Sequence, residues 1–176
     1  MHGINESLEF IPVRIAIMTV SDTRTLENDT SGETLVNRLE DAGHILADRK
    51  IVTDDKEEIA ATVKAWIADK GVDVVISTGG TGLTGRDVTP EAVEPLFDKT
   101  IEGFSVIFHK VSFESVGLST LQSRATAGVA DGTFIFALPG STGAVKDGWD
   151  KVINYQLDSR HKPCNLVEIM PRLMER

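Results

Sequence analysis

The chain has 176 residues, enough for one α/β domain that buries roughly 70% of its unfolded surface without a disulfide or structural metal. Its 27 acidic and 18 basic side chains give a formal charge of −9, which argues against a general attraction to nucleic acid. The single cysteine excludes an internal disulfide, and no apolar run reaches membrane-spanning length, so we expect a cytoplasmic protein with no membrane partner.

The first half of the chain alternates strand-like and helical patterns. Apolar, β-branched runs predict buried strands at residues 13–20 and 72–78, with a weaker strand at 44–52. Apolar residues at helical spacing predict a helix that starts at a Thr30–Glu33 capping box and stops at Gly43, and another at 56–69 with Trp66 in the core. This alternation predicts a doubly wound, mostly parallel sheet with helices on both faces.

The second half adds three helical segments and a hairpin. Helical spacing predicts helices at residues 89–98, 104–116 and 144–157. Strand patterns at 125–130 and 133–138 flank the turn pair Asp131 and Gly132, which predicts an added antiparallel strand. We therefore expect a single three-layer domain over residues 1–176, with an N-terminal arm at 1–12 and a C-terminal tail at 158–176.

Residues 74–90, VVISTGGTGLTGRDVTP, contain the clearest ligand-loop pattern. Glycines without Cβ let backbone amides approach an anion, and the nearby Asp87 can hold a cation. Two familiar motifs fit poorly. A dinucleotide fingerprint belongs in the first βα turn, and a phosphate-binding P-loop requires Lys and Ser or Thr where this chain has Arg86 and Asp87. A plain tight turn remains the structural alternative.

Four loops follow the predicted strands, at residues 21–24, 53–55, 79–87 and 139–143. Ligands of open parallel sheets bind outside the carboxyl ends of the strands, so these loops should form one site. Their glycines, hydroxyls and carboxylates suggest phosphate together with Mg²⁺, because carboxylates repel phosphate unless a cation lies between them. Asp22, Arg86 and Ser141 also have structural alternatives, as a turn former, a surface ion-pair partner and a helix cap.

The GGTG loop with Asp87-Val88-Thr89-Pro90, the Ser21-Asp22 pair and the later Leu138-Pro139-Gly140 resemble the molybdopterin-binding (MoaB/Mog) family over about residues 13–157. Residues 119–124 are most similar to its B branch. The resemblance implies molybdopterin adenylyltransferase activity, in which a terminal phosphate of the pterin attacks the α-phosphorus of ATP. It also implies that Asp54 and Asp87 are catalytic and hold Mg²⁺.

The expected substrate-binding residues come from three of the loops: Ser21, Asp22, Gly79, Gly80, Thr81, Gly82, Arg86, Pro139, Gly140, Ser141 and Thr142. Ser123 and Arg124 are weaker candidates. Two alternatives stay open. Asp55 could be the functional carboxylate in place of Asp54, and the chain could be a non-catalytic molybdopterin carrier or scaffold, although it keeps both aspartates.

The resemblance further implies a homo-oligomer, a trimer or a hexamer, and a downstream metal-insertion protein as a partner. The helix at residues 104–116 is apolar on more than one face, which makes it a candidate subunit interface. Its apolar members are Phe104, Ile107, Phe108, Val111 and Phe113. The four histidines are widely scattered, so we expect no zinc site.

Overall fold

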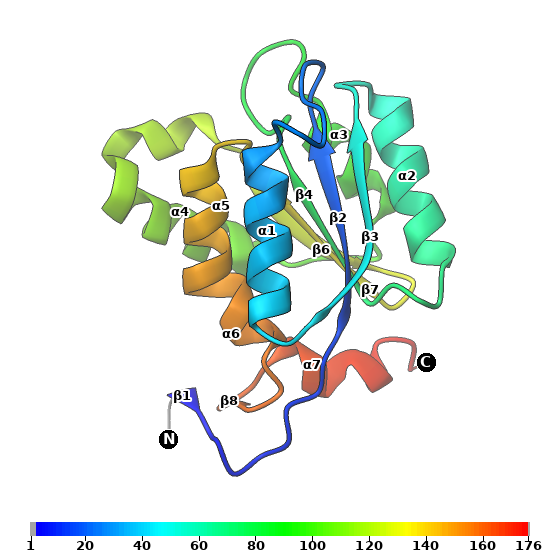
Figure 1. Cartoon of the computed structure of the whole chain (residues 1–176), viewed down its shortest axis with the longest axis vertical. Coiled ribbons are helices and arrows are strands. Elements are labelled where there is room, and N and C mark those ends of the chain that lie inside the picture. Colours follow the sequence, from blue (N-terminus) through cyan, green and yellow to red (C-terminus); the bar gives the residue numbers. More distant parts are fainter. Residues whose placement is uncertain (1–2, 176) are drawn as a thin grey trace.

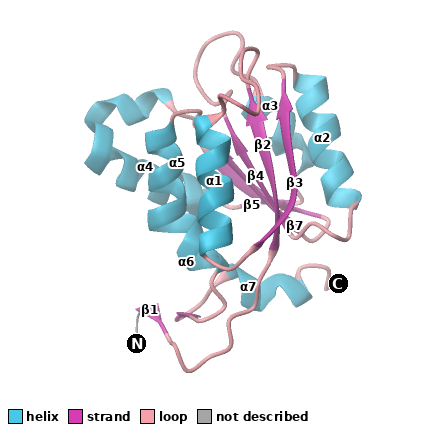
Figure 2. Cartoon of the chain, in the orientation of Figure 1, coloured by secondary structure: helices cyan, strands magenta, loops and turns pink. Residues whose placement is uncertain are grey.

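The computed structural model describes residues 3–175, which fold around a six-stranded sheet of order β3-β2-β4-β7-β6-β5 (Figures 1 and 2). Its strands are β2 (Arg14–Val20), β3 (Ile45–Val52), β4 (Val74–Thr78), β5 (Lys99–Thr100), β6 (Thr126–Ala130) and β7 (Thr133–Leu138). β3, β2, β4 and β7 are mutually parallel, and β6 runs antiparallel to both β7 and β5. The predicted mixed sheet is therefore confirmed.

Helices cover both faces of this sheet, as Figure 1 shows. One face packs against α1 (Thr30–Asp41), α4 (Glu102–Val116), α5 (Thr142–Gly148), the π-helical η3 (Trp149–Ile153) and α6 (Asn154–Leu157). The other face packs against α2 (Lys56–Ala68) and α3 (Thr89–Val93). Alternate residues of β2 divide between the two layers: Ile15 and Ile17 join the first core, while Met18 joins the second. Trp66 is 3% exposed in the second core, as predicted.

Side chains at the helix ends fix where the site loops stop. Asp29 caps α1 by accepting from the Gly32 amide, so the predicted Thr30 capping box is wrong by one residue. Gly43 ends that helix region with φ of +88°, a conformation that glycine tolerates. Asp55 caps α2 and Ser141 caps α5, each with its side-chain oxygen.

The second half departs from prediction in two places. The helix expected at residues 89–98 ends at Val93 and continues only as the 3₁₀ turn η1 (Glu94–Leu96), because Pro95 has no amide hydrogen to extend it. The next residues form the short edge strand β5. The hairpin between β6 and β7 is as predicted, with Asp131 and Gly132 both at positive φ.

The apolar helix α4 divides its residues between core and surface. Phe104 and Phe108 are buried against the sheet, so the expectation that they form a subunit interface is wrong. Ile107 and Phe113 are 46% and 54% exposed. Leu118 in the following 3₁₀ helix η2 (Gly117–Gln122) is 73% exposed, which extends this apolar surface.

The N-terminal end of the described chain pairs with a strand that precedes the C-terminal helix. β1 (Gly3–Ile4) and β8 (His161–Lys162) form a separate antiparallel sheet at the end of the molecule opposite the carboxyl ends of the parallel strands (Figure 1). α7 (Leu166–Ile169) and the 3₁₀ turn η4 (Met170–Arg172) follow. Within residues 3–175, no helix combines the length and apolar character needed to cross a membrane.

Candidate ligand-binding site

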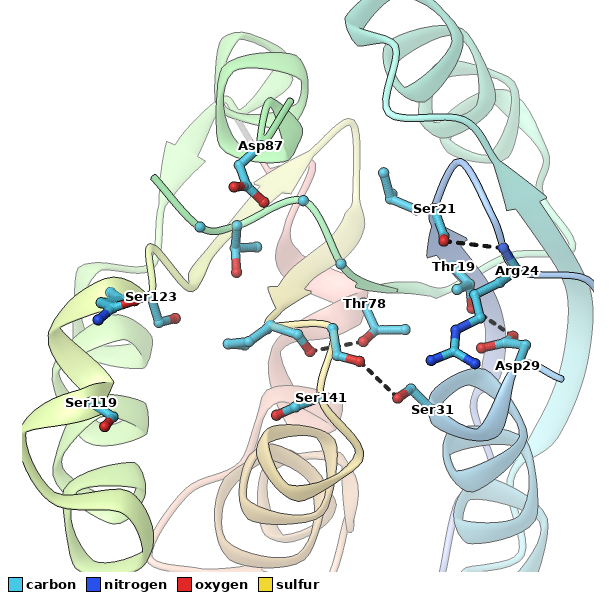
Figure 3. A pocket seen from close by; sticks show the side chains of 18 residues that line it. Thr19, Ser21, Arg24, Asp29, Ser31, Thr78, Asp87, Ser119, Ser123 and Ser141 are labelled. Carbon is cyan, nitrogen blue, oxygen red and sulfur yellow. Dashed lines mark hydrogen bonds between the residues drawn. The ribbon is translucent and has the colours of Figure 1, made fainter. Parts of the chain in front are cut away.

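A cavity of about 550 Å³ lies where β2, β4 and β7 end (Figure 3). Nine of the predicted site residues line it: Ser21, Gly79, Gly80, Thr81, Gly82, Asp87, Pro139, Gly140 and Ser141. Its walls come from the loop before α1, the glycine loop after β4, the η2 region and the loop before α5. Three strand ends therefore contribute to one hollow.

Close backbone contacts and hydrogen bonds fix the shape of the glycine loop. Gly79 has φ of +104°, and an added Cβ would lie 2.2 Å from the carbonyl oxygen of Val20 at the end of β2. A Cβ on Gly140 would lie 3.2 Å from Gly79 Cα, so the glycine loop and the loop before α5 touch through glycines. Thr89 fixes the loop from the helix side, because its Oγ1 donates to the Gly79 carbonyl and its amide donates to that of Gly80.

Arg124 anchors the other end of the same loop. Its guanidinium donates to the carbonyl oxygens of Gly82 (2.8 Å) and Asp87 (2.8 Å) and pairs with Glu91. Its amide donates to the Thr81 carbonyl. Arg124 does not line the cavity, so in this structure its contacts position the loop. Its neighbour Ser123 does line the cavity.

Asp87 faces the cavity with its carboxylate held in place. Oδ2 accepts from the Thr84 amide at 2.9 Å and from Thr84 Oγ1 at 2.6 Å. Burial alone would raise the pKa of Asp87, but the Thr84 hydrogen bonds and the Gly82 backbone outweigh it and hold the pKa below its usual range. Asp87 is therefore ionised at neutral pH.

Asp54 approaches the same loop at Gly80. Its Oδ2 accepts from the Asp22 amide at 3.0 Å, and its Oδ1 would lie 3.4 Å from a Cβ on Gly80. Burial raises the pKa of Asp54, and the negative charges of Asp22 and Asp87 raise it further. Asp54 does not line the cavity itself; it lies behind Gly80 while Asp87 lies against Gly82.

Asp22 and Arg86 form an exposed ion pair with an N–O distance of 2.7 Å, next to the cavity but outside its lining. The Arg86 hydrogen bonds hold the pKa of Asp22 below its usual range. Thr142, also predicted to bind substrate, lies outside the lining, and its Oγ1 is 3.2 Å from Ser31 Oγ. The structure thus separates Asp22, Arg86, Asp54 and Thr142 from the nine residues gathered around the hollow.

Sequence reasoning placed Arg24 in a site loop without giving it a role, and it did not name Asp29 or Ser31 as site residues. The other lining residues outside the expected binding set are Thr19, Val20, Thr78, Ser119, Gln122 and Ser123, the last a weaker candidate. Asp29 is 3% exposed. Its Oδ2 accepts from Thr19 Oγ1 (2.8 Å) and pairs with Arg49 (3.1 Å). Only the spacing of Asp29 to the start of the predicted helix could have indicated a structural role.

The cavity is suited to a polar, anionic ligand more than to a transition metal. Eight Ser or Thr residues line it, with glycine backbone and the Arg24 guanidinium. No group of three or more His, Cys, Asp or Glu that could hold a metal ion occurs within residues 3–175. The histidines of that part of the chain are absent from the lining, so the cavity offers no imidazole base.

Comparisons with known proteins agree on one family. A family model described as a probable molybdopterin binding domain matches residues 16–159. Molybdenum cofactor biosynthesis protein B of Escherichia coli (strain K12) is 55% identical over 159 residues, which covers 90% of this chain and 94% of that protein. A crystal structure of a molybdenum cofactor biosynthesis protein B matches with a TM-score of 0.82 and 46% identity, over 84% of this chain and 92% of that one. The tungsten cofactor synthesizing protein MoaB from Pyrococcus furiosus matches at 0.72 and 39%, over 80% and 90%.

Proposed function

The chain belongs to the molybdopterin-binding (MoaB/Mog) family of molybdenum cofactor biosynthesis proteins, and we propose that it is a molybdopterin adenylyltransferase. In this reaction a terminal phosphate oxygen of molybdopterin attacks the α-phosphorus of ATP. The bond from that phosphorus to the pyrophosphate oxygen breaks, and pyrophosphate leaves. AMP is thereby attached to the pterin.

The observation that supports this proposal best is that two carboxylates approach one short glycine segment. Asp54 lies against Gly80, and Asp87 lies against Gly82. The charge of Asp87 contributes to the raised pKa of Asp54, so the two groups interact electrostatically. Two like charges that interact in this way are unfavourable unless a cation lies close to both.

These residues fit Mg²⁺ in the manner usual for nucleotide enzymes. Magnesium keeps several waters and is commonly bound through one or two carboxylates plus substrate phosphates, so a cage of three protein ligands is not required. Asp54 and Asp87 would hold the ion. When bound, it would neutralise phosphate charge and stabilise the charge that develops during transfer.

The remaining lining residues would bind and orient the two substrates. Hydroxyls of Ser21, Thr81 and Ser141 can donate to ligand oxygens, and the N-terminus of α1 faces the same hollow. A phosphate nucleophile is already anionic at neutral pH, so the reaction needs positioning and charge stabilisation more than a protein base. The absence of histidine from the lining is consistent with this requirement.

The direct test is release of pyrophosphate from ATP by the purified protein with molybdopterin and Mg²⁺. Asp87→Asn should lower the rate by about two orders of magnitude or more, because an asparagine oxygen cannot supply the charge that holds the ion. Asp54→Asn should act in the same direction. Binding of molybdopterin to both variants, measured by calorimetry, should stay close to that of wild type.

Asp55→Asn is the matched control for Asp54→Asn. It makes the same chemical change one residue along, and asparagine preserves the α2 cap that Asp55 provides. We expect near wild-type activity. Loss of activity in Asp55→Asn with an active Asp54→Asn would assign the functional carboxylate to Asp55 instead.

A non-catalytic molybdopterin carrier or scaffold is the second candidate. The hydrogen bonds that Thr84 donates to Asp87 favour it, because they already satisfy one oxygen of the carboxylate. Tight molybdopterin binding by wild type, with no pyrophosphate released under any divalent metal tested, would establish the carrier and reject the enzyme.

We also propose that the chain acts as a homo-oligomer, a trimer or a hexamer, and passes its product to a metal-insertion protein. The exposed apolar side chains of α4 and η2 support a subunit contact on that surface. Sedimentation velocity of the wild-type protein measures the assembly. A monomer at micromolar concentration would reject this part of the proposal.

A further inference from the structure

Arg24 occupies a distinctive place in the loop between β2 and α1. It lines the 550 Å³ cavity, and with Ser21 it also lines a neighbouring hollow of about 430 Å³ that extends toward β3. In Figure 3 the Arg24 guanidinium points into the cavity on the side of Asp29, while Asp87, Ser119 and Ser123 lie on the other side. Arg24 therefore lies between two neighbouring hollows, across the cavity from the carboxylate of Asp87.

Arg24 differs from the other arginines of residues 3–175 in having no ion-pair partner. Every other arginine within residues 3–175 has a carboxylate within ion-pair distance: Arg14, Arg38, Arg49, Arg86, Arg124, Arg160 and Arg172. Arg24 has none among the described residues, although the chain carries a formal charge of −9. Its recorded side-chain bond is from one terminal nitrogen to the Asn28 carbonyl, at 3.0 Å. A guanidinium has five N–H donors, so most remain for a ligand.

The backbone that carries Arg24 is held by local hydrogen bonds. The amides of Thr23 and Arg24 both donate to Ser21 Oγ at 3.2 Å. The Thr25 amide donates a hydrogen bond to Asn28 Oδ1, and the Asn28 amide donates one to the Thr25 carbonyl oxygen. The guanidinium is thus presented from a fixed loop, which lowers the entropy lost when it binds a ligand.

Among the described residues, Arg24 is the unpaired cation of the cavity lining, on the side of Asp29. Asp29 pairs with Arg49, which also pairs with Glu33, and Asp29 forms no ion pair with Arg24. No other lysine or arginine lines the cavity. A phosphate can therefore meet a free guanidinium on one side of the hollow and the Asp87 carboxylate on the other.

We propose that Arg24 binds a phosphate group of the ligand and fixes which end of that ligand faces Asp87. The inference rests on the proposed function, because molybdopterin and ATP both carry phosphate. Arginine pairs with phosphate through two parallel N–H···O bonds, which gives direction as well as affinity. Arg24 is then a specificity-determining residue of the cavity.

Calorimetric titration of molybdopterin and of ATP, each alone, tests this on the full chain. Arg24→Gln should weaken binding of the contacted ligand by about 10- to 100-fold, the loss expected for charge-assisted hydrogen bonds. Arg24→Lys should be intermediate, because it keeps the charge and loses the paired geometry. It also covers the case in which Arg24→Gln fails to fold. The control is Arg38→Gln, which removes an arginine that pairs with Asp150 and does not line the cavity.

The two ligands separate the sources of phosphate. A loss confined to ATP places Arg24 on the nucleotide, a loss confined to molybdopterin places it on the pterin phosphate, and either result supports the inference. Binding of both ligands to Arg24→Gln within about twofold of Arg38→Gln would overturn it while leaving the proposed function intact. A wild-type protein that binds neither ligand would overturn both.

Discussion

Replacing Gly79 by alanine tests whether the cavity depends on close backbone contacts in the glycine loop. The new methyl group would start 2.2 Å from the Val20 carbonyl oxygen, and the residue would sit at φ of +104°. Positive φ costs a residue with a Cβ roughly 1–2 kcal/mol, and overpacking costs typically about 1–3 kcal/mol. We expect the free energy of unfolding to fall by about 2–4 kcal/mol, since part of the clash relaxes as the loop moves.

Two other glycines, one in the same loop and one in the loop before α5, provide matched comparisons. Gly85→Ala adds the same methyl group where no heavy atom lies within 4 Å and should change the free energy of unfolding by less than about 0.5 kcal/mol. Gly140→Ala places a Cβ 3.2 Å from Gly79 Cα and should cost an intermediate amount, about 1 kcal/mol. Equilibrium urea unfolding measures all three. Equal values for Gly79→Ala and Gly85→Ala would refute the reasoning.

Two further predictions concern pH and assembly. The pKa of Asp54 is raised in the folded state, so its ionised form lowers stability at neutral pH. Asp54→Asn should therefore raise the urea midpoint at pH 7. This gain should vanish as the pH falls below about 4, where the carboxyl group is protonated in both the folded and the unfolded state. Asp87 has a lowered pKa, so Asp87→Asn should lower the midpoint at pH 7 and converge with wild type in acid; matching signs for the two variants would contradict the electrostatic assignment. Phe113→Glu should shift sedimentation toward smaller species if α4 forms a subunit contact, whereas an unchanged distribution would place the contact elsewhere.

The sequence predicted the sheet because its evidence is local. Continuous β-branched runs marked β2 and β4, and the Asp131-Gly132 pair marked the hairpin. Residue patterns failed where tertiary packing decides. α4 is apolar on more than one face, so periodicity could not tell that Phe104 and Phe108 pack on the sheet while Phe113 remains exposed.

The same limit applies to the cavity. The glycine loop and Asp87 lie within one short segment, so their proximity could be read from the chain. Arg24 could be distinguished only by comparing it with arginines elsewhere, each of which meets a carboxylate from a distant or neighbouring segment. Arg86 lies outside the lining and pairs with Asp22 of a separate loop. Such a contact between distant segments cannot be read from the sequence.

The antiparallel pairing of β1 with β8 has a practical consequence for experiments on this protein. It holds the N-terminal end of the described chain on the side opposite the carboxyl ends of the parallel strands, and α7 and η4 carry the other end toward the β6–β7 turn on that same side (Figure 1). An affinity tag, fluorophore or surface tether attached at either end would therefore leave the cavity mouth unobstructed. Immobilised protein should accept small-molecule substrates as readily as free protein does.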